Sequence, residues 1–198
     1  GRRMTQPIIS SAATSERAKI TRTITLGYVA DPVARWVWPA PAAYLETMPN
    51  FAEAFGGRGF EQGSIYVADG GKAAAMWIPP DIEPDGEAIE AIIGETVPEA
   101  RMEEVAAFFD QMDVFHPVER CWYLPLIAAD PAFTGRGLGA SLMKYALQYC
   151  DNDNLPAYLE SSNPRNISLY ERHGFEMIGE IQVGSSPIMT PLLRQPRR

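Results

Sequence analysis

The sequence contains few cysteines, few histidines and no long apolar run. It has two cysteines and two histidines in 198 residues, too few for a disulfide framework or for a zinc site built on repeated Cys and His ligands. We expect Cys121 and Cys150 to be buried thiols. No segment is apolar over the roughly 18 residues that a membrane helix needs, and the sequence shows no signal peptide. We therefore expect a cytoplasmic protein with no membrane partner.

An excess of positive charge is also absent. The chain has 17 Lys and Arg against 25 Asp and Glu, a formal net charge of −8. Proteins that bind nucleic acid typically present a basic surface to the phosphates, so nucleic acid is not an expected partner, and the acidic balance favours a cationic or amine-bearing substrate. The length and the apolar fraction of 46% fit one domain over residues 4–198. Residues 1–3, which precede Met4, resemble a tag remnant.

The most informative segment is residues 127–140, where an apolar strand passes through a glycine-rich loop into a helix. Glycine permits left-handed dihedrals and close approach of a ligand to the backbone. The first N–H groups of a helix lack intrahelical partners and lie at the positive end of its dipole, so this loop is typical of a phosphate site. It lacks the lysine of a P-loop and the third glycine of a dinucleotide fingerprint.

A second segment, residues 155–175, predicts a short strand followed by a capped helix. Asn163 is the expected N-cap, Pro164 the first helical residue and Gly174 the left-handed stop. With this segment the chain resembles the GCN5-related N-acetyltransferase (GNAT) family: the family's glycine loop falls on residues 134–139 and its Asn…Leu-Tyr-Glu-x-x-Gly-Phe motif on residues 163–175. Residues 158–175 are similar to the puromycin N-acetyltransferase type. Thr134 departs from the family's usual Gln or Arg.

The resemblance covers residues 122–180 and implies a single α/β domain. Its central sheet would be mixed, mostly antiparallel and splayed at the acetyl-CoA site, with helices on both faces. It implies an enzyme, monomeric or homodimeric, that moves acetyl directly from acetyl-CoA to a primary amine of a small molecule in a ternary complex, with no metal. A protein lysine or amino-terminal acetyltransferase and a non-catalytic acyl-CoA-binding sensor remain open as alternatives.

The resemblance also implies which residues bind the cofactor. The strand would contact the pantetheine arm through its backbone, the loop would bind the pyrophosphate, and the second segment would complete the site. These residues are Ile127, Ala128, Ala129, Thr134, Gly135, Arg136, Gly137, Leu138, Gly139, Ala140, Asn163, Asn166 and Tyr170.

Three side chains are candidates for proton transfer. A phenol with a pKa near 10 can protonate a thiolate whose conjugate acid has a pKa near 8.5, and the family motif gives this acid role to Tyr170, which could instead be a core residue. The base is open between Glu160 and His116. Glu160 could also be a strand-end charge paired with Arg165 or Arg172, and His116 a solvated or capping residue in a loop.

The amino-terminal half has no family motif but contains several expected elements. Residues 64–68 and 73–78 predict a β-hairpin, and Thr96 and Glu99 predict a capping box that opens a helix. We expect about a third of the large aromatic residues to line the substrate pocket. The candidates are Trp36, Trp38, Trp77, Trp122, Phe108 and Phe109.

Overall fold

A seven-stranded sheet forms the centre of the molecule in the computed structural model, which describes residues 5–198. The predicted tag remnant at residues 1–3 lies outside the described residues. The strand order is β1-β2-β3-β4-β5-β7-β6, and only the β4–β5 pair is parallel. This confirms the predicted mixed, mostly antiparallel sheet. The strands are β1 (Ile9–Ser11), β2 (Ile65–Ala68), β3 (Ala73–Ile78), β4 (Trp122–Ala129), β5 (Ala157–Ser161), β6 (Glu176–Met177) and β7 (Thr190–Arg194).

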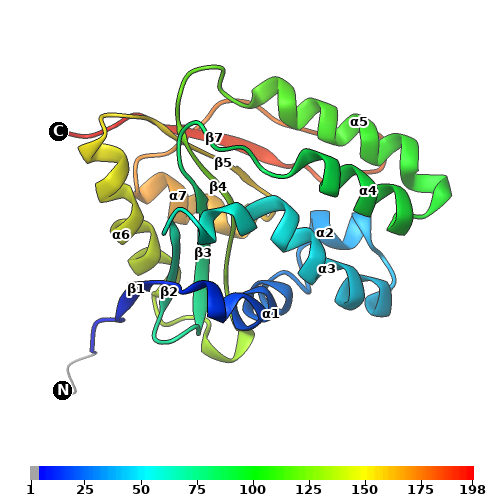
Figure 1. Cartoon of the computed structure of the whole chain (residues 1–198). Helices are drawn as coiled ribbons and strands as arrows, with labels where there is room; N and C mark the ends of the chain where they lie inside the picture. Colours follow the sequence, from blue (N-terminus) through cyan, green and yellow to red (C-terminus); the bar gives the residue numbers. More distant parts are fainter. Residues whose placement is uncertain (1–4) are drawn as a thin grey trace.

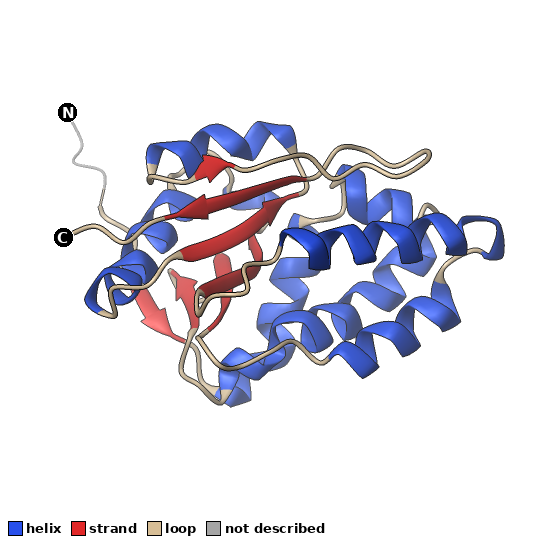
Figure 2. Ribbon diagram, turned by 90° about the horizontal axis from the view of Figure 1, so that it is seen from above, coloured by secondary structure: helices blue, strands red, loops and turns tan. Residues whose placement is uncertain are grey.

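Helices cover both faces of the sheet, as predicted (Figures 1 and 2). Side chains alternate along a strand, so Ala74 and Met76 of β3 join the core under the first five helices, whereas Ala75 and Trp77 join the core under the last two. One face carries α1 (Arg17–Gly27), α2 (Pro32–Val37), α3 (Pro41–Gly56), α4 (Gly86–Thr96) and α5 (Glu99–Phe115). The other carries α6 (Leu138–Asn152) and α7 (Ile167–Arg172). Within residues 5–198, no helix is both long and apolar enough to cross a bilayer.

The sheet splays between β4 and β5. The two strands pair only over Trp122–Leu124 and Ala157–Leu159, although β4 continues to Ala129. The register between β3 and β4 shifts between Met76 and Ile78, which leaves one extra residue on β4 near Pro125. A bulge bends and twists its strand, and proline has no N–H to give to a neighbouring strand. The bulge and the proline both favour separation of β4 from β5, and the sheet opens at this point.

Local signals predicted the hairpin correctly and the capping box wrongly. The hairpin forms between β2 and β3. Thr96, however, is the last residue of α4, and α5 begins at Glu99 with no side-chain cap. The Thr96 hydroxyl donates to the Ile92 carbonyl and accepts from the indole of Trp38 at 2.8 Å. The capping box is lost because a buried indole elsewhere in the chain takes the hydroxyl as its acceptor.

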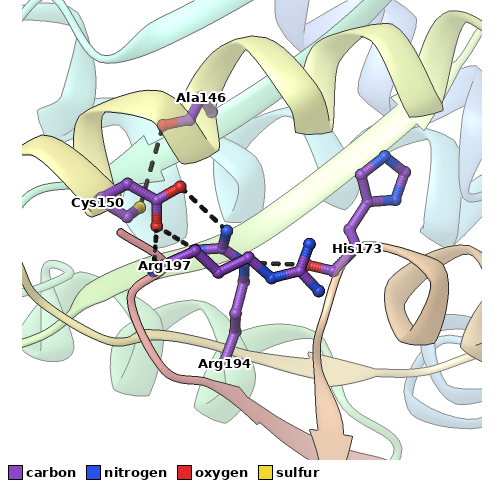
Figure 3. A network of polar contacts seen from close by, with 6 residues as sticks. Ala146, Cys150, His173, Arg194 and Arg197 are labelled. Atoms are coloured by element: carbon purple, nitrogen blue, oxygen red, sulfur yellow. Dashed lines mark hydrogen bonds and ion pairs between the residues drawn. The ribbon is translucent and has the colours of Figure 1, made fainter.

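A polar network joins β7 to α6 and α7 (Figure 3). The Arg194 side chain is 3% exposed and forms a two-point ion pair with Asp151 of α6, at 2.8 and 3.1 Å. It also donates to the carbonyl of His173, just after α7, at 2.8 Å. The guanidinium lowers the pKa of Asp151. Cys150 beside this network, like Cys121, is a buried free thiol, as predicted.

Candidate active site

The glycine-rich loop has the backbone geometry of an anion cradle. Gly137 is the N-cap of α6 in the left-handed conformation, with φ of 73°, and Gly135 has φ of 78°. A Cβ at either position would meet nothing within 4 Å, so glycine is needed there for its backbone conformation, and the space beside the loop is open. The first N–H groups of α6 border this space. The loop therefore has the backbone geometry of a site for an anionic group such as a phosphate.

Two cations lie next to the loop. The Arg136 guanidinium carbon is 5.1 Å from the ring centre of Phe133, and Lys72 Nζ is 4.9 Å from the same ring. Thr134 stands where the family usually has Gln or Arg, and its hydroxyl donates a hydrogen bond to the carbonyl of Pro131 at 3.2 Å. Positive charge beside the loop favours a phosphate ligand, and the Thr134 hydroxyl supports the turn.

Beyond its pairing with β5, β4 has an open edge whose backbone groups can contact a ligand in the gap between the two strands. The Ile127 amide donates to the Tyr28 hydroxyl at 3.1 Å, and therefore faces away from β3. Backbone groups alternate along an antiparallel strand, so those of Ala129 also face the gap, whereas Ala128, paired with Ala74, faces β3. Two of the three strand residues expected to contact the pantetheine arm thus have their backbone groups on the open side.

Glu160, near the end of β5, lies between two tyrosines. Tyr123 on β4 donates to its Oε1 at 2.5 Å, and Tyr158 lies within 3.4 Å of its Oε2. Burial raises the pKa of Glu160 to about 7, the phenols partly oppose this shift, and the negative charge of Asp113 adds to it. A carboxylate with this pKa can accept a proton near neutral pH.

His116, just after α5, lies in the same cluster. Its ring packs edge-on against Tyr123 and Tyr158, with ring centres 4.7 and 5.1 Å apart. Burial lowers the pKa of His116, while the charges of Asp113 and Glu83 oppose the shift, so the imidazole is neutral at pH 7. The structure brings both predicted base candidates to one pair of tyrosines.

Tyr170, the predicted acid, is a buried side chain of α7 with 5% exposure. Its hydroxyl has no hydrogen-bond partner among residues 5–198, and its oxygen is not among the fully buried atoms that lack one, so the hydroxyl is accessible to a ligand. Burial and the charge of Asp31 raise the pKa of Tyr170, so the phenol keeps its proton. Asp31 is itself buried, and accepts from Ser162 at 2.6 Å and from the Ala34 amide at 3.0 Å.

Two cavities meet at Glu160. The first is walled mainly by apolar side chains of α2, α3, α5 and β4, with Asp31, Ser162 and Glu160 as polar members. The second, of about 580 Å³, lies between α4 and α5 and also reaches Glu160. Trp38, Phe108 and Phe109 line the first cavity, three of the six aromatic candidates. The others pack elsewhere: for example, the Trp36 indole donates to Ser185 at 3.0 Å.

The remaining candidates have mainly local roles. Asn163 caps the short 3₁₀ turn η4 (Pro164–Asn166), accepting from the Arg165 amide at 3.1 Å, and Asn166 ends this turn with an exposed side chain. Among the ion pairs of residues 5–198, none joins Glu160 to Arg165 or Arg172, so the charge-pair alternative for Glu160 is wrong.

Sequence reasoning missed Tyr28, Asp31 and Tyr123 as members of the site. The Asp-Pro pair at residues 31–32 is a helix-start signal, which Asp31 satisfies as N-cap of α2. No local pattern indicated that this cap would face a cavity shared with Glu160.

Comparisons with known proteins agree with this geometry. A model of the acetyltransferase (GNAT) family matches residues 34–175. An uncharacterized N-acetyltransferase, C550.08, from Schizosaccharomyces pombe is 35% identical over 57 residues, which span 29% of this chain and 23% of that protein.

Solved structures share the fold over nearly the whole chain. A structure described as histone acetyltransferase HPA2 and related acetyltransferase, from Corynebacterium glutamicum, has a TM-score of 0.69 at 21% identity and covers 98% of both chains. The polyamine N-acetyltransferase of Drosophila melanogaster has a TM-score of 0.66 at 18% identity, covering 96% of this chain and 100% of its own. Arylalkylamine N-acetyltransferase 2 of Aedes aegypti has a TM-score of 0.65 at 10% identity, covering 98% and 100%.

Proposed function

The chain belongs to the acetyltransferase (GNAT) family and is an acetyl-CoA-dependent N-acetyltransferase, and we propose that its acceptor is the primary amine of a small molecule. The observation that carries this proposal is the pair of cavities that meet at Glu160: an apolar, aromatic cavity of about 60 Å³ with Glu160 and Asp31 in its wall, and the cavity of about 580 Å³ beside it. Cavities with apolar walls and a few polar groups are typical of small-ligand sites. Fold neighbours described as polyamine and arylalkylamine acetyltransferases support the same acceptor class.

Glu160 is the proposed acceptor of the proton from the substrate ammonium. The amine must lose a proton before its lone pair can attack, and a base is most effective when its pKa is close to the working pH. The raised pKa of Glu160, about 7, meets this requirement. The hydroxyls of Tyr123 and Tyr158 hold the carboxylate toward the cavities. His116 is the alternative base, because it is neutral at pH 7 and lines the second cavity with Glu160.

Three features form the proposed acetyl-CoA site: the glycine-rich loop, the open edge of β4 and Tyr170. Bound acetyl-CoA supplies an activated acetyl thioester. The amides around Gly135 and Gly137 would hold the pyrophosphate, and the backbone of Ile127 and Ala129 would orient the pantetheine arm. For the Ile127 amide to do this, the Tyr28 hydroxyl must leave it. Burial raises the pKa of Tyr170, so the phenol stays protonated and would supply the proton that the sulfur of CoA takes up when the thioester bond breaks.

A thiol-release assay across a panel of amines tests the proposal. The panel contains arylalkylamines, polyamines, amino acids, an aminonucleoside and a lysine peptide, and product mass confirms acetylation. The aminonucleoside tests the resemblance of residues 158–175 to the puromycin N-acetyltransferase type. We expect thiol release with at least one small amine at a kcat/KM well above that for the peptide. A preference for the peptide would indicate a protein acetyltransferase. Tight acetyl-CoA binding without thiol release for any acceptor would indicate a sensor.

A further inference from the structure

The larger cavity extends the substrate site beyond Glu160. It has a volume of about 580 Å³ and runs between α4 and α5, within the size range of small-ligand sites. It shares Phe55, Phe109, Met112 and Glu160 with the apolar cavity. An amine placed at Glu160 can therefore extend the rest of its molecule into this second space, which we call the outer groove.

Negative charge is concentrated in the outer groove. Its lining includes Glu83, Glu90, Asp110, Asp113 and Glu160, with no lysine or arginine. In the described part of the chain, none of these five side chains forms an ion pair. A cleft lined by charges of one sign with apolar walls concentrates counter-ions. The outer groove therefore favours a cationic ligand.

Apolar side chains separate the carboxylates along the groove. Ile89 and Ile93 of α4 face the same cavity as Met102 and Ala106 of α5. Such a surface suits a hydrocarbon spacer, while the carboxylates suit ammonium or guanidinium groups. The ligand that matches this pattern has one amine at Glu160, an apolar linker and a second cation in the outer groove.

Resting on the proposed function, we infer that the acceptor is a dication, a diamine or polyamine, whose second cation is held in the outer groove by Glu90 and Asp110. Both carboxylates line the groove, Glu90 from α4 and Asp110 from α5. Exposed single ion pairs contribute little to binding, so the preference for a dication requires several carboxylates in one groove, and it should weaken as salt screens them.

Two acceptors with the same carbon chain, one with a second amine and one without, test this inference. The kcat/KM values for 1,6-diaminohexane and hexylamine are measured in wild type, in the double variant Glu90→Gln with Asp110→Asn, and in a control double variant, Glu95→Gln with Glu103→Gln. The control removes two carboxylates from the same helices at exposed positions that do not line the groove. Circular dichroism verifies that each variant is folded.

We expect wild type to prefer the diamine at least tenfold at low salt, and the groove variant to lose most of that preference through KM. The control variant should keep it. Equal kcat/KM values for the two amines in wild type, or a preference that survives in the groove variant, would overturn the inference. Hexylamine turnover with no diamine preference would leave the proposed function standing, whereas no thiol release from any amine would refute both.

Discussion

Replacing Glu160 with glutamine should stabilise the folded protein above neutral pH. Burial raises the pKa of Glu160 from its ordinary value of 4.5 to about 7, so the folded state binds this proton more tightly than the unfolded state does. Stability is then greatest where the group is protonated in both states, and it falls as the pH rises from 4.5 through 7. The glutamine variant lacks the charge and should lack this decline.

The size of the effect follows from the pKa difference. A pKa change from 4.5 to about 7 corresponds to a cost of about 3 kcal/mol for the ionised group at pH 8, and to less than about 1 kcal/mol at pH 5. Glutamine keeps one oxygen that can accept from Tyr123, and its NH2 group can donate to the hydroxyl of Tyr158. The variant should therefore gain about 2 to 3 kcal/mol over wild type between pH 5 and pH 8.

Urea unfolding of both proteins at several pH values measures this difference. All other carboxylates are common to the two proteins, so their contributions cancel in the comparison. Glu103→Gln provides a control, because it makes the same chemical change at an exposed position on α5. A difference between Glu160→Gln and wild type that stays constant from pH 5 to pH 8 would refute the raised pKa and remove the main physical reason for assigning Glu160 as the base.

Substitutions at three further positions test cofactor binding, the acid role and the fold. Tyr170→Phe should lower turnover about 100-fold while CoA affinity stays within about twofold, and near-normal turnover would return Tyr170 to a packing role. Gly137→Glu should weaken CoA binding in calorimetry by at least about tenfold, because a carboxylate would border the phosphate space. Gly137→Ala, which adds backbone strain without charge, should weaken binding less, and equal losses would contradict the charge argument. Arg194→Met should lower the free energy of unfolding by about 3 kcal/mol at pH 7, because Asp151 loses its buried partner. A loss below about 1 kcal/mol would contradict a structural role for this network.

The parts of the site that sequence reasoning predicted depend on local signals. The glycines at 135 and 137 need positive φ, and Asn163, Pro164 and Gly174 mark the ends of a helical segment whatever surrounds them. The structure confirms these signals: all three glycines have positive φ, and Asn163 caps its turn. Glu160 was a candidate base only through the family resemblance, since its spacing also fitted a charge pair.

The missed parts depend on contacts between distant segments. Tyr28 reaches Ile127 across 99 residues, and Ser162 reaches Asp31 across 131. Neither hydrophobic periodicity nor a capping residue predicts which distant segment will pack beside the open edge of β4. The capping box at Thr96 failed for the same reason, because Trp38, 58 residues away, takes its hydroxyl. Tertiary contacts override local preference where a buried polar group needs a partner.

The pH dependence of kcat/KM for one small amine tests the central claim most directly, which is that the Glu160 carboxylate accepts the substrate proton. It is measured in wild type, Glu160→Gln and His116→Ala, each first shown to bind CoA. We expect wild type and His116→Ala to share a rising limb with an apparent pKa near 7, and Glu160→Gln to lose that limb together with about 100-fold or more of the activity. A Glu160→Gln profile with the wild-type limb and activity would contradict the claim, and loss of the limb in His116→Ala alone would assign the base to the imidazole.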